Sequence, residues 1–254
     1  MKSNSRQSLI YDYIKKHHEV SSNHIAQYFN ISSVTVRRYL DKLEENGLIY
    51  RKYGKAVIVD NSKAEFSFFL RASKNIEHKN AIARLALPYL LKSSSAFFDA
   101  STTAMALLKM LPASHSMTIY ASNAVVLNHL LDYPNIKLFI LAGYLSKTDG
   151  VTLDSEITLN IAKQICVDTA FISCGGFSKD GFFDNATTGI EVKRAILQNS
   201  AHNYLLADST KFNAKGIFKV DDWGPIQTLI CNRSFDKQSE KLLFKKDVKV
   251  IYGI

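Results

Sequence analysis

Cysteine is scarce in this sequence, and the few cysteines present are not arranged for a metal or for disulfides. The 254 residues contain three, Cys166, Cys174 and Cys231, an odd number with no CxxC spacing and no nearby histidine pair. We therefore expect neither a zinc site nor a disulfide framework, and we expect a reducing compartment. The sequence gives no reason to expect any other metal or cofactor.

Long hydrophobic runs are also missing. The longest, IARLALPYLL, contains Arg84 and Pro88 and is too short to span a bilayer. The first residues, MKSNSRQSLIYDYIKKHH, lack the apolar stretch of a secretory signal. These absences predict a cytoplasmic protein with no membrane partner.

Acidic residues are the scarcer charged class. The chain has 23 Asp and Glu against 32 Lys and Arg, a formal net charge of +9. Residues 1–57 hold ten of these cations and five of the acids, so this short segment carries more than half of the excess. Such a segment suits a polyanionic partner, although a solvated basic surface would give the same composition.

Residues 1–60 have the periodicity of three helices followed by a hairpin. Helical patterns occupy residues 5–18, 20–30 and 31–47, with Gly47 expected to end the third, and the short turn NIS lies between the second and the third. This spacing is typical of a helix-turn-helix. Two β-prone runs then flank the letters KYGK, which predicts a two-stranded wing.

The third helix presents arginines on the side away from its core. Val36, Leu40 and Leu43 recur at helical spacing, which outweighs the β-branched start of SSVTVRRYL. On its outer face Arg38 should point into the DNA major groove, where arginine reads guanine edges, while Arg37 should meet phosphate. A plain helical bundle with surface arginines is the competing interpretation. The residues expected to contact DNA are Ser32, Ser33, Val34, Thr35, Arg37 and Arg38 of the helix, and Arg51, Lys52 and Lys55 of the wing.

Residues 77–254 alternate helix-like and strand-like segments. Short buried strands alternating with helices indicate a parallel sheet covered on both faces. The predicted fold class is therefore α/β, with a winged helix-turn-helix domain at 1–60, a linker at 61–76 and a larger α/β domain at 77–254. Within the linker, a weak helical face contains Phe66, Phe69 and Leu70. Strand patterns cover residues 95–100, 116–121, 136–143, 168–176, 202–208, 226–232 and 248–252, and the last helical pattern covers 239–245.

Polar residues follow several of these strands, at what should be one edge of the sheet. Ligands of open parallel sheets bind at the carboxyl ends of the strands. The letters DASTT follow a strand and open a helix, so hydroxyls and helix N–H groups there could hold a phosphate. Two aspartates would accept from sugar hydroxyls, two lysines would supply positive charge, and two glycines would let the backbone approach closely. Any one of these residues could instead be a cap or a turn. The expected set is Asp99, Ser101, Thr102, Thr103, Ser122, Asn123, Gly175, Gly176, Lys193, Asp208 and Lys211.

The stretch SSVTVRRYLDKLEENGLIYRKYGKA resembles the recognition helix and wing of the DeoR family of bacterial repressors. The family's pattern is Ser-x-x-Thr-(Ile/Val)-Arg-Arg-Asp-Leu, then Leu-Glu-x-x-Gly, then Arg-x-(His/Tyr)-Gly-Gly-Ala. The remaining chain is similar to the family's sensor domain in FFDASTTAMAL, IYASNAVVL, LFILAGYL, DTAFISCGGFSKDG, GIEVKRAIL and LLADSTKF. The sequence departs from the family at Tyr39 in place of Asp, at Lys55 in place of a wing glycine, and at Ala100, Ser101, Ser122 and Ala142. Lys55 is expected to restrict the wing turn.

The resemblance implies a repressor of a carbohydrate or related operon. Its sensor domain should be similar to the ribose-5-phosphate isomerase fold and should bind a phosphorylated sugar or similar effector. Its other partners should be double-stranded operator DNA and further copies of itself, because one small reading head covers few bases.

Two other functions compete with this one. The first is a sugar-phosphate isomerase with a DNA-binding appendage, which the carboxylates Asp99, Asp184, Glu191 and Asp208 with Lys211 would permit. Against it, no short motif supplies the positioned base that isomerisation needs, so we do not expect an enzyme. The second is a constitutive DNA-binding protein, if Ala100 and Ala142 have emptied the effector pocket.

Overall fold

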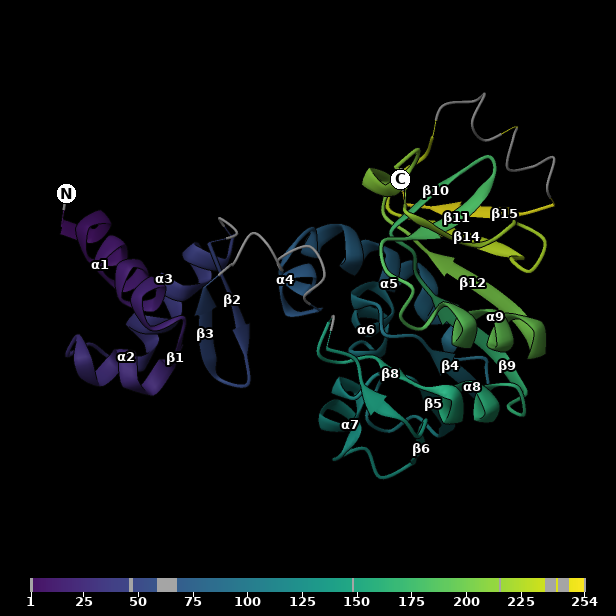
Figure 1. Ribbon diagram of the computed structural model, residues 1–254, viewed down its shortest axis with the longest axis horizontal. Helices are drawn as coiled ribbons and strands as arrows, with labels where there is room; N and C mark the ends of the chain where they lie inside the picture. The colour runs from purple at the N-terminus through teal and green to yellow at the C-terminus, as the bar shows by residue number, and fades with distance from the viewer. Residues whose placement is uncertain are drawn as a thin grey trace. The chain divides into compact units, whose positions relative to one another are not determined.

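The computed structural model describes residues 2–45, 48–58, 68–147, 149–214, 216–235, 241 and 247–253 (Figure 1). The chain forms two compact units, Met1–Ile76 and Glu77–Ile254. Each unit has its own hydrophobic core. The α/β fold class with an N-terminal helix-turn-helix is confirmed.

The smaller unit contains the three predicted helices and a sheet. The sheet has the order β1-β3-β2 and is antiparallel, so β1 adds a third strand to the predicted two-stranded wing. Gly47 and residues 61–67 lie outside the described residues. The elements are α1 (Lys2–His17), β1 (Glu19–Ser21), α2 (Ser22–Tyr28), α3 (Ser33–Glu45), β2 (Ile49–Lys52), β3 (Lys55–Ile58) and α4 (Phe68–Ser73).

Local residue chemistry explains where the helices of this unit begin and turn. The hydroxyl of Ser21 accepts from the backbone N–H of His24 at 3.1 Å, which caps α2. Asn30 ends that helix region with φ of 49°, a left-handed conformation that asparagine tolerates. Val36, Leu40 and Leu43 of α3 are all buried in the core of the unit, as their spacing predicted.

The wing turns through two residues with positive φ. Tyr53 has φ of 48° and Gly54 has φ of 76°, the backbone of a tight hairpin whose twist matches the flanking strands. Lys55 follows as the first residue of β3 and has an ordinary φ. The expectation that Lys55 restricts the turn is therefore wrong, because the positions with special backbone demands are the two before it.

The larger unit is built on a seven-stranded parallel sheet of order β15-β14-β12-β9-β4-β5-β6. The helix expected at 239–245 lies almost entirely outside the described residues. The elements of the sheet and its helices are α5 (Ile76–Leu90), β4 (Ser95–Phe98), α6 (Thr102–Leu108), β5 (Met117–Ala121), α7 (Val125–Leu130), β6 (Ile136–Ile140), α8 (Glu156–Ala162), β9 (Val167–Ile172), α9 (Ile190–Asn199), β12 (Ser200–Leu206), β14 (Thr228–Cys231) and β15 (Lys249–Tyr252).

The strand order contains one topological switch point. The chain enters the sheet at β4, runs outward through β5 and β6, and then returns to β9 on the other side of β4. From β9 it runs outward again through β12, β14 and β15. The carboxyl ends of β4 and β9 therefore diverge into loops that lead in opposite directions, which is where open sheets of this kind form a crevice.

Helices cover both faces of this sheet (Figure 1). On one face Phe98, Phe171 and Tyr204 form a row of stacked rings, and Tyr89 of α5 packs against its end. On the other face Phe97 belongs to a buried cluster with residues of α8 and α9. The two-sided burial explains why these strands read as short, nearly continuous apolar runs.

Short additional strands were not predicted. A three-stranded antiparallel sheet has the order β10-β11-β13, and β7 and β8 form a two-stranded sheet. No helix among the described residues is both long enough and apolar enough to cross a membrane. These additional elements are β7 (Tyr144–Leu145), β8 (Leu153–Asp154), β10 (Gly176–Ser178), β11 (Gly181–Asp184), the 3-10 helix η1 (Ser209–Lys211) and β13 (Phe218–Asp221).

Candidate functional site

The outer face of α3 combines an exposed valine with two exposed arginines. Val34 is 77% exposed, whereas Val36 on the opposite face is fully buried. Arg37 and Arg38 are both exposed. An exposed valine side chain beside guanidinium groups matches the thymine methyl and guanine acceptors that base pairs display in the major groove.

The start of α3 is held by Ser32. Its hydroxyl accepts from the backbone N–H of Thr35 at 3.2 Å and lies 2.9 Å from the Thr35 hydroxyl. Ser32 thus satisfies one of the free N–H groups of the first turn, as a cap does. Ser33, the first residue of the helix, is exposed beside it.

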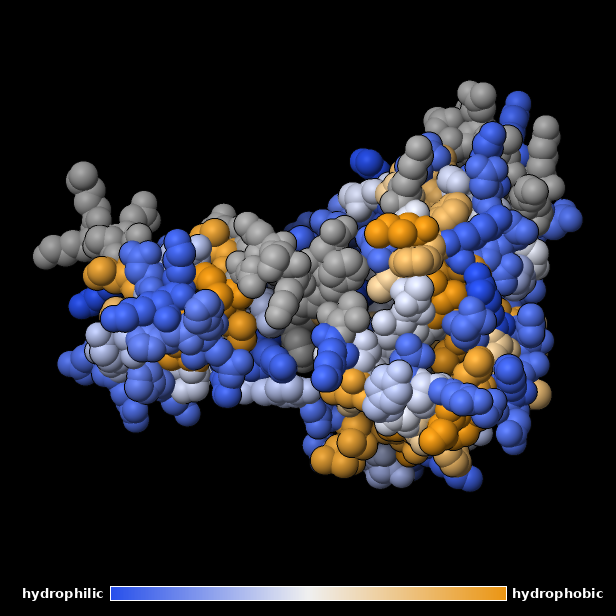
Figure 2. Space-filling model, viewed as in Figure 1, coloured by the Kyte–Doolittle hydropathy of each residue, from blue (hydrophilic) through white to orange (hydrophobic). Residues whose placement is uncertain are grey.

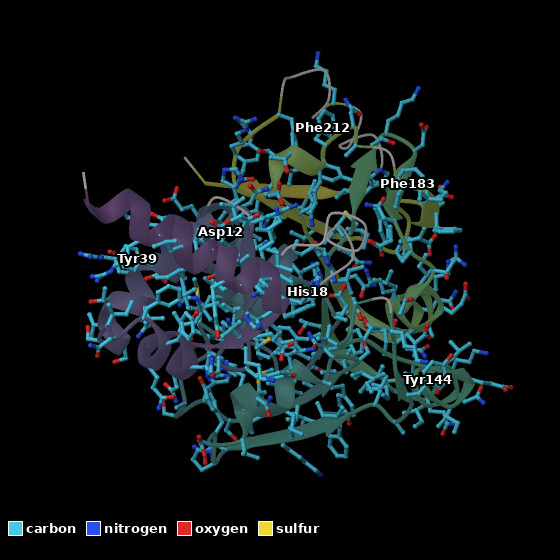
Figure 3. All side chains as sticks on the ribbon, turned by 60° about the vertical axis from the view of Figure 1, so that its left-hand side comes forward. Asp12, His18, Tyr39, Tyr144, Phe183 and Phe212 are labelled. Atoms are coloured by element: carbon cyan, nitrogen blue, oxygen red, sulfur yellow. The ribbon has the colours of Figure 1, made fainter. Side chains whose placement is uncertain are left out.

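Tyr39 is a core residue of the smaller unit (Figure 3). It is 5% exposed and packs with the buried face of α3. The guanidinium carbon of Arg38 lies 5.5 Å from the centre of the Tyr39 ring, within cation–π distance. The aromatic residue that replaces the family's Asp therefore fills the core and at the same time contacts Arg38.

Arg51 of the wing is tied to α3. Its guanidinium forms an ion pair with Asp41 and donates to the backbone carbonyl of Arg37 at 3.2 Å. Its backbone N–H donates to a carboxylate oxygen of Glu44 at 2.9 Å, and its Nε atom lies 3.5 Å from the other oxygen of that group. Arg51 thus links β2 to the helix through several contacts.

The other two cations of the wing are placed differently. Lys55 forms an ion pair with Glu19 of β1, and both side chains are largely exposed. An exposed pair of this kind contributes little to stability and can exchange partners. The Nζ atom of Lys52 lies 6.0 Å from the centre of the Tyr53 ring at the wing turn.

In the larger unit, Asp99 spans the switch point of the sheet. It follows β4 directly and is 2% exposed. One carboxylate oxygen accepts from the backbone N–H of Ser101 at 3.0 Å, and the other accepts from that of Ser173, which follows β9, at 3.1 Å. The carboxylate therefore joins the two loops that diverge from the switch point.

Lys193 of α9 faces two carboxylates at once. Its Nζ atom lies 2.7 Å from an oxygen of Asp184 and 3.1 Å from an oxygen of Asp99, and it donates to the carbonyl of Ser173 at 2.8 Å. Burial disfavours the ammonium charge, but the two carboxylates outweigh burial and raise the pKa of Lys193 above its ordinary value. Its positive charge, which the sequence suggested for a ligand, is already balanced by the protein.

Lys211 is the second lysine at this edge. Its Nζ atom donates to the hydroxyl of Ser173 at 3.1 Å, a neutral partner. Among the residues that the structure describes, no carboxylate lies within ion-pair distance of Lys211. The neighbouring Asp208 is 1% exposed and accepts from the backbone N–H of Thr210 at 3.0 Å. Lys211 therefore offers positive charge that Lys193 does not.

Two buried polar atoms at the ends of β4 and β5 have no hydrogen-bond partner among the described residues. They are Oγ1 of Thr103 and Nδ2 of Asn123, whose side chains are 1% and 0% exposed. The oxygen of the Asn123 amide accepts from Val125 N–H at 2.9 Å, so the side chain is held in place. Buried unpaired groups are costly, and both atoms belong to residues of the expected set. In contrast, the Ser101 hydroxyl is used as the cap of α6, accepting from Ala104 N–H at 3.1 Å.

Gly176 of the expected set and Gly143, outside that set, both stand where a larger residue would collide with the protein. A Cβ atom on Gly176 would lie 2.2 Å from the carbonyl oxygen of Ala214, so the chain itself occupies the space beside it. In the LFILAGYL segment, Gly143 has φ of 152° and a Cβ there would lie 2.1 Å from the hydroxyl of Thr158. Ala142 before it needs no such space, since its carbonyl simply accepts from that hydroxyl at 2.6 Å. The unusual backbone conformation of this segment falls on Gly143, which is a glycine. The departure from the family at Ala142 therefore does not disturb the backbone.

The structure brings most of the expected effector residues to one edge of the sheet. Asp99, Ser122, Ser173 and Asp208 follow β4, β5, β9 and β12, which are four consecutive strands of the sheet in the order β12-β9-β4-β5. Sequence reasoning missed Ser173, which accepts or donates in three of these contacts, and it did not assign Asp184 to the effector site. No group of three or more metal-ligating side chains occurs in the described parts of the chain.

Two family descriptions match this chain. The DeoR-like helix-turn-helix domain matches residues 6–62, and the DeoR C terminal sensor domain matches residues 74–233. The second match alone covers more than half of the sequence.

Curated relatives match over nearly their full length. The HTH-type transcriptional regulator GolR of Listeria innocua is 29% identical over 242 residues, 95% of this chain and 93% of the relative. The glycerol-3-phosphate regulon repressor of Escherichia coli is 29% identical over 221 residues, 87% of each chain. The L-fucose operon activator of Haemophilus influenzae is 26% identical over 252 residues, 98% of this chain and 99% of the relative.

Solved structures show weaker similarity. Ribose 5-phosphate isomerase A from Methanocaldococcus jannaschii is 14% identical and covers 55% of each chain, with a TM-score of 0.39. The eIF2B delta subunit from Chaetomium thermophilum is 12% identical and covers 64% of this chain and 59% of the other, with a TM-score of 0.46.

Proposed function

Because the chain belongs to the DeoR family of transcriptional regulators, we propose that it represses a carbohydrate or related operon under the control of a phosphorylated effector. Operator DNA binds the smaller unit, and a phosphorylated sugar or similar metabolite binds the larger one. The domain limits are those expected from the sequence, with residues 1–60 reading DNA and residues 77–254 sensing the effector.

The exposed face of α3 supports the DNA-binding half of the proposal. Val34 and Arg38 contact base edges in the major groove, while Arg37 and the start of the helix contact phosphates. Lys52 and Lys55 of the wing contact the flanking backbone. Arg51 acts on DNA through α3, because its guanidinium is engaged by Asp41 and by the Arg37 carbonyl.

The observation that carries the effector half is the pair of unpartnered buried atoms, Thr103 Oγ1 and Asn123 Nδ2, at the same sheet edge as Lys211. A hydroxyl and an amide donor without protein partners suit a ligand rich in hydroxyl and phosphate oxygens. The lysine without a carboxylate partner suits the phosphate. The tie between Asp99, Asp184 and Lys193 fixes the loops around them, and Asp208, Ser122 and the backbone near Gly175 complete the site.

Ligand control requires a difference in affinity between two states of the protein. An effector can shift the DNA-binding equilibrium only as far as it binds the non-binding state more tightly. Relatives named as a repressor and as an activator both occur, so the direction of control belongs to the proposal.

A thermal-shift screen with sugar phosphates and their unphosphorylated counterparts, followed by an isomerase assay on every compound that binds, tests this function. The proposal predicts that at least one phosphorylated compound raises the unfolding temperature of the larger unit and is recovered unchanged. Turnover of that compound would instead support the isomerase. No response to any phosphate ester, with intact DNA binding, would support a constitutive DNA-binding protein.

A further inference from the structure

The edge of the large sheet at β6 carries an unusual share of exposed apolar side chains. We name it the β6 surface. Figure 2 shows hydrophobic surface gathered around α7 and the neighbouring end of the sheet, and Tyr144 lies at the outside of the larger unit in Figure 3. An apolar area of this kind on a soluble protein marks an interaction site more often than chance. The β6 surface consists of Leu127 of α7 and Leu131 directly after it, 48% and 73% exposed, Phe139 of β6, 41% exposed, and Tyr144 and Leu145 of β7, 68% and 47% exposed.

The backbone of β6 also presents unpaired groups on this side. β6 is the outermost strand of the sheet and pairs with β5 on its inner side. The N–H of Leu141 donates to the carbonyl of Ala121 in β5 at 2.9 Å. Because N–H and C=O groups alternate in direction along a strand, Lys137 and Phe139 also direct theirs toward β5. Ile136, Leu138 and Ile140 therefore direct theirs outward.

We propose that β6 pairs antiparallel with β6 of a second copy of this chain, across a two-fold axis at Leu138, so that two sheets become one. In this register Leu138 exchanges both backbone hydrogen bonds with its own copy. The N–H of Ile140 donates to the carbonyl of Ile136 on each side of the axis. The N–H of Ile136 is already used, since it donates to Tyr133 at 3.3 Å, so only that donor is unavailable.

The side chains of β6 suit the same register. In this register each residue before Leu138 lies opposite the residue the same number of positions after Leu138 in the second copy. Lys137 therefore faces Phe139 of the second copy, and the two Lys137 side chains do not face each other. Within one chain the Lys137 Nζ atom already lies 5.3 Å from the Phe139 ring centre, and that ring stacks on Tyr120 at 4.9 Å. The pairing would thus place each cation over an aromatic ring of the partner and avoid like charges in direct opposition. Ile136 and Ile140 meet on the other face.

A second copy is the occupant that the proposed function calls for, and this step rests on that function. One helix-turn-helix reads a single half-site, and two-fold operators are matched by two-fold proteins. A self-complementary edge generates a closed dimer with that symmetry. The contrasting possibility is that Lys137 merely protects an edge strand from pairing, as charged residues on edges do.

Disulfide cross-linking of the full chain tests the register. Leu138→Cys is placed in a Cys166→Ser background, which removes the exposed native cysteine and leaves the two buried ones. Directly opposed strand residues are close enough for a disulfide, so mild oxidation should give covalent dimers of this variant. Ile217→Cys, at a 72% exposed apolar residue elsewhere in the larger unit, is the control and should stay monomeric on denaturing gels. Equal cross-linking of the two variants would overturn the register.

Sedimentation equilibrium tests the surface without DNA. Wild-type chain should be dimeric, and Phe139→Glu should weaken self-association by at least about tenfold while its monomer stays folded, whereas Ile217→Glu should remain dimeric. A monomeric wild type, or a Phe139→Glu variant as dimeric as wild type, would overturn the proposal. Phe139→Glu should then bind a duplex with one half-site as tightly as wild type does, and should bind a duplex with two half-sites more weakly than wild type does. Failure of all variants to bind DNA would count against the proposed function and leave the sedimentation result standing.

Discussion

The guanidinium of Arg51 in the wing donates to the backbone carbonyl of Arg37 in α3, at 3.2 Å. The same group pairs with Asp41, one turn further along the helix. Together these contacts join β2 of the wing to α3. Arg51, which the sequence suggests as a phosphate contact, is therefore engaged with α3, and we propose that it acts on DNA by holding α3 in place.

Asp41→Asn separates this geometric role from simple electrostatics. Removing a negative charge near DNA should by charge alone tighten binding to every sequence. If Arg51 holds α3 through Asp41, the variant should instead bind operator more weakly and narrow the ratio of operator to random-DNA affinity. Arg51→Ala should do the same. Fluorescence anisotropy on both duplexes measures the ratio, and tighter binding of Asp41→Asn to both would contradict the tie.

Lys52→Ala is the comparison variant for Asp41→Asn and Arg51→Ala, because Lys52 is proposed to contact DNA phosphates. It should weaken binding to operator and random DNA alike, and the slope of log affinity against log salt should become shallower by about 1. A series of anisotropy titrations at increasing salt gives that slope. A loss of affinity for operator alone would contradict this, and would indicate that Lys52 contacts bases and not the DNA phosphates.

Arg38→Ala should weaken operator binding by about 1–3 kcal/mol and relax the sequence preference at the base pair it reads. Arg37→Ala, its neighbour on the helix, should lower affinity for all sequences and leave the preference unchanged. Selection from a randomised duplex pool with each variant shows the difference. Identical selected sequences for wild type and Arg38→Ala would remove Arg38 from the base-reading set.

Substitutions of Lys193 and Lys211 should have different effects. Lys193→Met leaves the buried Asp99 and the partly buried Asp184 without a counter-charge, which costs about 3–5 kcal/mol of folding free energy. Lys211→Ala should change stability little and should abolish the effector's influence on DNA binding, and Thr102→Ala should also abolish it. Trp223 is buried in this unit and is the only tryptophan, so its fluorescence reports the unfolding. A Lys211→Ala variant that still releases operator with the wild-type effector would show that the effector site is wrongly placed.

Stability should fall in mild acid because of His202. Its pKa is lowered by burial and then by the charge of Lys249, and its ring lies 3.0 Å from the Thr228 hydroxyl. An unfolded histidine titrates near about pH 6.5, so below that pH the unfolded chain binds more protons than the folded one. The stability is therefore fully present above about pH 6.5 and decreases as the pH falls. Urea unfolding followed by Trp223 fluorescence should show this decrease, and His202→Gln should make it smaller; an equal decrease in both would exclude His202 as a cause.

Much of the fold could be predicted because its signals are local. The spacing of Val36, Leu40 and Leu43 identifies α3 against the β-branched propensity of its first residues, and the structure buries all three. The alternation of apolar runs with helical segments was enough for the parallel sheet. The strands of the β10-β11-β13 sheet were not predicted. Because β10 has three residues and β11 begins with a glycine, neither shows the alternation of apolar and polar residues that identifies a strand.

The contacts at the switch point could not be predicted in the same way. Asp99 is far in the sequence from Asp184 and Lys193, and only the fold brings it to them. Nothing local distinguishes Lys193, whose charge is balanced, from Lys211, whose neighbour is a serine hydroxyl. Tyr39 is similar, because its place in the core and against Arg38 depends on how α3 packs on its neighbours.

The most direct test of the central claim is the affinity of the full chain for a duplex selected from a random pool, measured by anisotropy with and without sugar phosphates. The panel should contain glycerol 3-phosphate, ribose 5-phosphate and fructose phosphates, each beside its unphosphorylated form. We predict that at least one phosphate ester weakens operator binding by about tenfold or more, that its unphosphorylated form does not, and that Lys211→Ala does not respond. Operator affinity that stays the same with every phosphate ester would contradict control by a phosphorylated effector.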